Sequence, residues 1–278
     1  MIFRASRRVL TLAILASLST SVPGSDTGIV TSYGFAVFGA LKYAETFKHF
    51  DYVNPEAPKG GVFRSAAMGY FDSFNVASVM SFPPLAEELL VFDKLMARSL
   101  DEPASQYGML AETISYPRDF AWVEYKLRAN ARFSDGRPVT PEDVVFSVGV
   151  AKNAGRTYLR RAGAPIKAAF KTGPRSVRIE LIQKNSPTMV ATIGDLIILP
   201  KHYYERMDMT KGNMTLPLGS GPYRIKSFVA GRSVYFERRK DYWAENLPVA
   251  RGRYNMDIRY DWYRDTAVYN EGFLSGEN

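Results

Sequence analysis

Residues 131–148 read ARFSDGRPVTPEDVVFSV, and this stretch indicates a tight turn followed directly by the start of a helix. Asp135 and Gly136 are residues that turns favour. Thr140 can cap a helix, and Pro141 suits the first helical position because its fixed φ matches the helix and its missing N–H is not needed there. The two acidic residues that follow favour the positive end of the helix dipole. We therefore assign this stretch to folding, and it implies a helix packed beside strands.

The sequence on either side of this stretch alternates between strand and helix patterns. Around residue 123, apolar and polar residues alternate with the period of a half-buried strand. A serine followed by a proline at 186–187 repeats the cap-then-proline start. These rules predict strands over residues 62–66, 120–127, 177–182, 196–199, 223–228, 233–238 and 258–262, and helices over 85–100, 140–155, 187–193 and 266–275. The predicted fold class is therefore α/β, in its mixed α+β form.

Composition excludes several kinds of chemistry. The 278 residues include no Cys, which removes thiol catalysis, disulfides and zinc-thiolate sites. The two histidines, His49 and His202, are far apart in the sequence and lack carboxylates at a supporting spacing, so we predict surface or interface positions for both. We accordingly predict no metal site and no cofactor.

The N-terminus has the order of a secretory signal peptide over residues 1–24. Arg4, Arg7 and Arg8 precede a short apolar run, and small residues follow it. The run is too short to span a bilayer, and the later sequence has no longer one, so we predict an exported, periplasmic protein that does not itself span the membrane. Without the three leader arginines the excess of 36 Lys and Arg over 28 Asp and Glu becomes mild, which argues against nucleic acid as a partner.

Two blocks of sequence carry a family resemblance. The first lies within residues 110–147 and centres on the turn and helix start quoted above. The second consists of Gly219, Ser220, Gly221, Pro222 and Tyr223, followed after the predicted hairpin by Arg238, Asp241, Tyr242 and Trp243. In this order and at this separation, the blocks resemble the family 5 extracellular solute-binding proteins, the peptide- and nickel-binding branch of ABC import systems. Residues 41–61, 98–103 and 251–255 further resemble its YejA-like subgroup, which binds oligopeptides and microcin C.

The resemblance implies a periplasmic-binding-protein type II-like lobe of cluster C. Members of the family are much longer, two-lobed clamps, so we expect residues 25–278 to form the N-terminal lobe, with the second lobe missing. Within it, the resemblance implies a main subdomain over residues 33–75 and 198–278 and an inserted subdomain over residues 76–197.

The function implied is that of an exported substrate-binding component of an ABC importer for oligopeptides or peptide-like compounds. It would capture the ligand in an interlobe cleft and deliver it to an inner-membrane ABC permease with its ATPase. The alternative is a truncated, non-transporting remnant with at most an interaction or chaperone-like role. A single lobe cannot close on a ligand, so we expect it to retain little of the family's affinity. An enzyme would need paired carboxylates in a cleft, and no such spacing occurs; we predict no catalytic residues.

By the same resemblance, the loop after the first predicted strand faces the cleft. Tyr70, Phe71, Asp72 and Phe74 are therefore the candidate substrate-binding residues. Aromatic walls suit apolar side chains of a peptide. We assign the glycine-rich run at 219–221 to a tight entry into a strand, because no Lys follows it as a phosphate loop would require.

Overall fold

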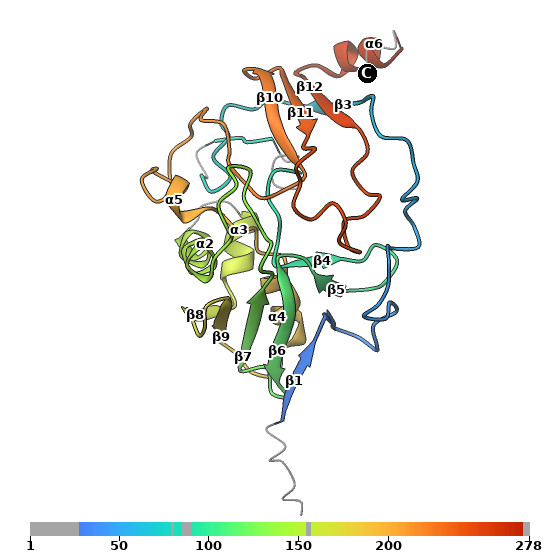
Figure 1. The fold of residues 1–278 in the computed structure, drawn as a ribbon. Coiled ribbons are helices and arrows are strands. Elements are labelled where there is room, and N and C mark those ends of the chain that lie inside the picture. The colour runs from blue at the N-terminus through green and yellow to red at the C-terminus, as the bar shows by residue number, and fades with distance from the viewer. Residues whose placement is uncertain (1–27, 79–80, 85–89, 154–156, 275–278) are drawn as a thin grey trace, which may run out of the picture.

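The computed structural model describes residues 28–78, 81–84, 90–153 and 157–274, and the predicted signal peptide lies outside them (Figure 1). Among the described residues, no helix has the length and apolarity needed to cross a membrane. The strands are β1 (Ile29–Ser32), β2 (Gly34–Ala36), β3 (Val62–Met68), β4 (Met96–Arg98), β5 (Ser105–Gly108), β6 (Ala111–Pro117), β7 (Trp122–Leu127), β8 (Ile166–Lys171), β9 (Ser176–Leu181), β10 (Tyr223–Val229), β11 (Ser233–Arg238) and β12 (Asp257–Tyr263). The helices are α2 (Pro141–Asn153), α3 (Thr157–Gly163), α4 (Pro187–Gly194), α5 (Lys201–Tyr204) and α6 (Thr266–Leu274).

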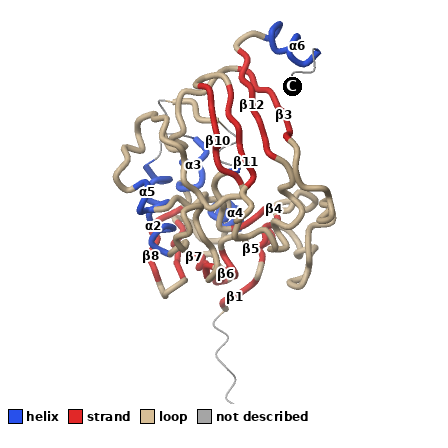
Figure 2. The backbone as a smooth tube through the Cα atoms, turned by 45° about the horizontal axis from the view of Figure 1, so that its top comes forward, coloured by secondary structure: helices blue, strands red, loops and turns tan. Residues whose placement is uncertain are grey.

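The strands form three sheets. One has five strands in the order β1-β6-β7-β9-β8, one has four in the order β10-β11-β12-β3, and one has three in the order β2-β5-β4. Figure 2 shows the four-stranded sheet at one end of the molecule and the five-stranded sheet at the other. The mixture of sheets and helices confirms the predicted fold class.

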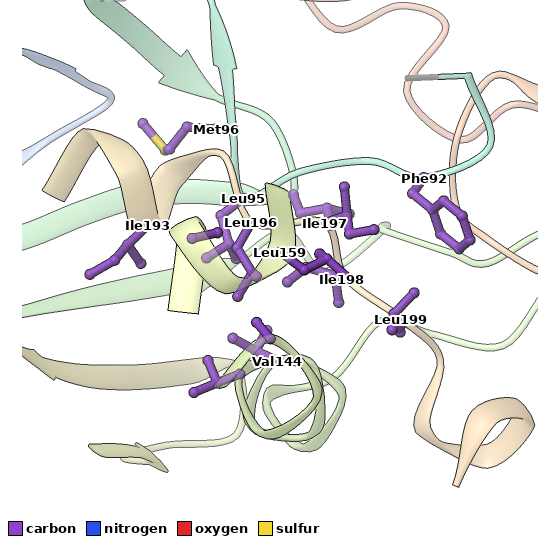
Figure 3. Packing of buried hydrophobic residues seen from close by; sticks show 14 of the residues in the cluster. Phe92, Leu95, Met96, Val144, Leu159, Ile193, Leu196, Ile197, Ile198 and Leu199 are labelled. Atoms are coloured by element: carbon purple, nitrogen blue, oxygen red, sulfur yellow. The ribbon is translucent and has the colours of Figure 1, made fainter. Parts of the chain in front are cut away.

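The five-stranded sheet follows the predicted alternation. Val123, Tyr125 and Leu127 of β7 are fully buried, as the pattern predicts, and β9 pairs with β7 in antiparallel register. Helix α2 begins at Pro141, where the cap and proline place it. Figure 3 shows Val144 of this helix in the apolar core, which also takes side chains from α3, α4 and the run Leu196, Ile197, Ile198 and Leu199. The same core cluster continues into the four-stranded sheet through Tyr223, Val234 and Phe236.

The four-stranded sheet contains the two strands that end beside the candidate site. Its hairpin β10–β11 and its strand β12 were all predicted, and Val234 and Phe236 of β11 are fully buried. Strand β12 pairs with β3 in parallel, with Asp257 opposite Val62 and Tyr263 opposite Met68. Both strands therefore end at the same edge. Helix α6 lies beyond that edge in both views (Figures 1 and 2).

Two predicted elements differ from the structure. Residues 85–89 of the helix predicted over 85–100 lie outside the described residues and Leu90 is helical, but Met96 to Arg98 form strand β4, so the second half of that prediction is wrong. The Leu95 N–H donates to the Leu196 carbonyl across 3.3 Å instead of to a residue one helical turn back. The run 196–199 is buried, but it does not form the predicted strand. Its only strand-like pairing among the described residues is an isolated antiparallel bridge between Lys94 and Ile197. A short apolar run that is buried on all sides has no clear period, so its pattern cannot separate helix, strand and coil.

The predicted subdomains remain a proposal. The four-stranded sheet takes all its strands from residues 33–75 and 198–278, and the five-stranded sheet takes four of its five from residues 76–197. The three-stranded sheet joins β2 of the first part to β4 and β5 of the second.

Candidate functional site

The candidate site lies where the parallel strands β3 and β12 end. In open sheets, ligands bind in the crevice outside the carboxyl ends of parallel strands, because the loops that follow them diverge there. The Gly69 N–H donates to the Tyr263 carbonyl across 2.9 Å, which continues the pairing by one residue. The loop 69–74 then leaves the sheet. The sheet thus delivers the predicted binding loop to the edge that the topology favours.

Two of the four predicted residues are exposed. Tyr70 has 47% of its surface exposed, and its ring lies 5.3 Å, centroid to centroid, from the ring of Phe82, which is 56% exposed. Asp72 is exposed and accepts a hydrogen bond from the Phe82 N–H across 2.7 Å, while its own N–H donates to the Phe82 carbonyl. The two segments therefore hold each other, and they present an aromatic pair beside a carboxylate.

The other two predicted residues are part of the core. Phe71 is 1% exposed and its ring lies 4.9 Å from that of Trp262 on β12. Phe74 is 2% exposed and meets the edge of the Phe228 ring at 5.0 Å. In this structure both rings anchor the loop, and a ligand would meet their neighbours first.

Phe82 was missed by the sequence reasoning. Its signal is the pair of prolines that follow it, Pro83 and Pro84. A proline restricts the preceding residue to extended backbone, which keeps that residue out of a helix. Phe82 therefore joins Tyr70 as an exposed aromatic residue of the candidate site.

Buried polar contacts with residues 211–213 hold the candidate loop in place. Ser73 Oγ donates to the Asn213 carbonyl and accepts from the Asn213 N–H, each across 3.0 Å. The Asn75 side-chain amide donates to the Lys211 carbonyl across 2.7 Å. Ser73 and Asn75 are buried, so these bonds form away from water and fix the backbone firmly. The exposed side chains of the loop are therefore held in place before any ligand arrives.

A cavity of about 780 Å³ adjoins this loop. Trp262 and Tyr263 line it and also contact the loop, Trp262 through its ring and Tyr263 through its carbonyl. Its lining comprises Arg64, Ala230, Gly231, Arg232, Arg259, Asp261, Trp262, Tyr263, Arg264, Asp265 and Val268. Four arginines against two aspartates make it positively charged.

The second family block forms a buried polar cluster. Asp93 accepts from the Tyr242 hydroxyl across 2.8 Å and from the Trp243 indole N–H across 2.9 Å. Burial raises the pKa of Asp93 to about 6, against the lowering effect of these hydrogen bonds. A Cβ at Gly219 would lie 2.1 Å from the Val91 carbonyl oxygen, so only glycine fits there. This block supports the fold, as its assignment to a tight strand entry anticipated.

The two histidines lie apart with separate partners. His202 Nε2 is 2.7 Å from Asp135 Oδ2, and His49 Nδ1 is 2.9 Å from the Phe50 carbonyl. Both side chains are partly exposed. The part of the chain that the structure describes holds no group of three or more His, Asp or Glu residues that could bind a metal ion.

Comparison with known proteins identifies the family. The family model for the bacterial extracellular solute-binding proteins, family 5 middle, matches residues 106–278, and the chain belongs to this family. YejA of Escherichia coli K12 is 42% identical over 251 residues, which are 89% of this chain and 41% of YejA. The probable peptide-binding protein YejA of Agrobacterium fabrum is 37% identical over 280 residues, which are 98% of this chain and 45% of that protein. These matches confirm the predicted family and its YejA-like subgroup.

Solved structures confirm the fold. The oligopeptide-binding protein AppA of Bacillus subtilis, in complex with a nonapeptide, matches with a TM-score of 0.62 at 20% identity, over 79% of this chain and 43% of AppA. NikZ of Campylobacter jejuni, in complex with Ni(L-His), also matches at 0.62 and 20%, over 78% of this chain and 42% of NikZ. This chain thus spans less than half the length of the relatives that it matches.

Proposed function

We propose that this chain acts as the substrate-binding component of an ABC importer and captures an oligopeptide or peptide-like compound. Membership of family 5 supports the binding role, and the relative from Agrobacterium fabrum is named a probable peptide-binding protein. The observation that carries the proposal is the exposed pair of Tyr70 and Phe82, held beside the Asp72 carboxylate at the carboxyl ends of β3 and β12.

The chemistry of this edge suits a peptide. The two rings offer apolar surface to a side chain, and the Tyr70 hydroxyl can form a hydrogen bond at the rim. One oxygen of Asp72 accepts a hydrogen bond from the Phe82 N–H. The carboxylate keeps acceptor capacity for a ligand ammonium or amide N–H. A few placed polar groups beside an apolar wall is the usual composition of a small-ligand site.

Relatives support a peptide-like ligand. AppA is described with a nonapeptide, and YepA of Agrobacterium fabrum, 32% identical over 96% of this chain and 45% of its own length, is named a peptidoglycan-binding protein. The order of residues 1–24 supports export to the periplasm, where the ligand would be passed to an inner-membrane permease with its ATPase.

Capture in such importers works through a shift of population. A ligand that bridges two lobes binds the closed state more tightly than the open one and so favours closure. The described residues supply one wall of such a cleft, and the loop 69–74 with Phe82 forms the part of that wall which would meet the ligand.

A second candidate is a non-transporting role in interaction or chaperone-like holding. It is favoured by exposed apolar residues on edge strand β3, above all Phe63 and Met68, which are about half exposed. Exposed apolar surface of this kind marks a place where other molecules can associate.

Native mass spectrometry separates the two candidates. The 278-residue chain is mixed with equimolar tri- to octapeptides, and the importer role predicts that a subset of peptides is retained and then lost in a Tyr70→Ala variant. A folded chain that retains no peptide, yet suppresses aggregation of an unfolded client without selectivity, would favour the second role.

A further inference from the structure

The cavity beside the candidate loop is lined by four arginines. Its arginines come from the strands β3 and β12 and from the two segments that follow β10 and β12 in the chain. Its lining runs along β3 and β12 from Arg64 and Arg259 to Tyr263 and reaches Val268 of α6, a helix that contacts both strands. Figure 2 shows α6 beyond the end of these two strands. Two strands and the two segments that follow β10 and β12 thus each contribute an arginine to the same cavity.

The two carboxylates of the cavity are already engaged. Arg259 donates to both oxygens of Asp261, from Nε across 2.8 Å and from Nη2 across 2.9 Å. Asp265 caps α6, because its Oδ1 accepts from the N–H groups of Ala267 and Val268. Neither acid makes a hydrogen bond or ion pair to Arg232 or Arg264 among the described residues.

Two arginines are left without a side-chain partner among the described residues. The guanidinium groups of Arg232 and Arg264 make no hydrogen bond or ion pair within the described ranges, and both side chains are exposed. Their charges add to that of the positive N-terminal end of α6. With four arginines and two aspartates, the lining of the cavity keeps a formal excess of positive charge.

The backbone that carries Arg232 is fixed. Gly231 takes φ +68° in the hairpin turn, and the Trp262 N–H donates to the Arg232 carbonyl across 2.7 Å. A Cβ built on Gly231 would lie 3.5 Å from the Phe71 carbonyl oxygen, so the turn also packs against the candidate loop. The hairpin turn beside the cavity thus contacts the candidate loop.

We propose that this cavity binds a carboxylate of the peptide ligand. This inference rests on the proposed function. A guanidinium group matches a carboxylate in a planar, two-bond geometry, and two unpaired guanidinium groups are suited to one such group. The carboxylate is either an acidic side chain or the C-terminus of the peptide, and the two sources are separable by amidation.

Isothermal titration calorimetry on the full 278-residue chain tests the proposal. The probes are Ala-Ala-Glu-Ala-Ala-Ala and its Gln counterpart, each with a free and an amidated C-terminus. We expect the form with the recognised carboxylate to bind about tenfold more tightly than its neutral counterpart, and this ratio to shrink as salt rises. In the double variant Arg232→Gln, Arg264→Gln the ratio falls to about one. The control variant Arg251→Gln, an exposed arginine outside the cavity, keeps the ratio of the parent chain.

The outcomes separate this inference from the proposed function. Equal affinity for all four peptides overturns the inference and leaves peptide capture intact. If none of the four binds, peptide capture is contradicted for these probes. Binding of glutarate, a small dicarboxylate, then tests whether the cavity binds a carboxylate. Saturable quenching of tryptophan fluorescence by glutarate, through Trp262 in the cavity wall, supports the carboxylate site when the double variant abolishes it. Absence of that quenching overturns the site.

Discussion

The Tyr242 hydroxyl donates to the buried Asp93 carboxylate across 2.8 Å, although the two residues lie 149 positions apart. Trp243 donates to the other oxygen, and the Asp93 N–H reaches Ser220 Oγ across 3.3 Å. The family block 219–243 therefore converges on one carboxylate in the run that leads into β4. This cluster joins the end of the four-stranded sheet to the middle of the molecule, and its burial makes it sensitive to charge.

Stability should fall with pH through the titration of Asp93. Its pKa is raised to about 6 in the folded chain, so the folded state holds the proton more tightly than an unfolded aspartate does. The resulting stabilisation is complete below the unfolded pKa and is lost as pH rises through the folded pKa. Two pKa units correspond to about 3 kcal/mol, so the free energy of unfolding of the parent chain, relative to Asp93→Asn, should drop by up to that amount between about pH 4 and 7. Urea unfolding at several pH values measures this difference, and a difference that rises with pH would contradict it.

Gly219→Ala should prevent stable folding. The added Cβ would meet the Val91 carbonyl oxygen, which is backbone and cannot move away cheaply. Gly149→Ala is the matched control, because this exposed glycine in α2 has open space at its Cβ position. Removing a glycine from a helix interior should stabilise the chain by about 0.5–1 kcal/mol. Thermal unfolding of both variants checks the contrast. Equal effects would show that the close approach at Gly219 is not required.

Alanine substitution of the exposed and of the buried aromatic residues at the candidate site should affect stability and peptide binding differently. Phe71→Ala and Phe74→Ala remove buried rings and should each cost about 3–5 kcal/mol of stability. Tyr70→Ala and Phe82→Ala remove exposed rings and should cost much less, while weakening retention of peptide. Denaturant unfolding and native mass spectrometry on the same four variants report both properties. Loss of peptide only in the Phe71 and Phe74 variants would place the ligand elsewhere.

The helix start at α2 should depend more on Asp143 than on Thr140. The Asp143 carboxylate accepts from the Thr140 N–H and from the Lys201 N–H, each across 2.8 Å, and so ties α2 to α5. Asp143→Ala leaves both donors without an acceptor and should cost about 2–4 kcal/mol. Thr140→Ala removes one cap and should cost about 1 kcal/mol. Urea unfolding of the two variants gives the order, and the reverse order would refute this division of roles.

The sequence predicted the elements whose local signals agree with their environment. Strand β7 alternates because one face is buried and the other is not, and α2 begins where cap, proline and acidic residues coincide. Strands β1, β2, β4, β5, β6 and β8 and helices α3 and α5 were not predicted. Several of these elements are short, so their own residues carry little periodicity and their partners far along the chain define them.

The candidate loop was located only through the family resemblance. Which of its side chains point outward could not be read from its residues, because a loop has no period. Trp262 and Phe228 decide this by covering Phe71 and Phe74, and both come from strands far along the chain. The arginine cavity likewise depends on the parallel register of β3 and β12, which places Arg64 opposite Arg259.

The most direct test of the central claim is thermal unfolding of the 278-residue chain with and without a mixed tri- to octapeptide library. A ligand raises the unfolding temperature only if it binds the folded state. If the loop after β3 forms a peptide-binding wall, the library should raise the cooperative transition by a few degrees. Tyr70→Ala should remove that increase while changing the transition of the free chain only slightly. A transition that no peptide moves would contradict peptide capture by this chain.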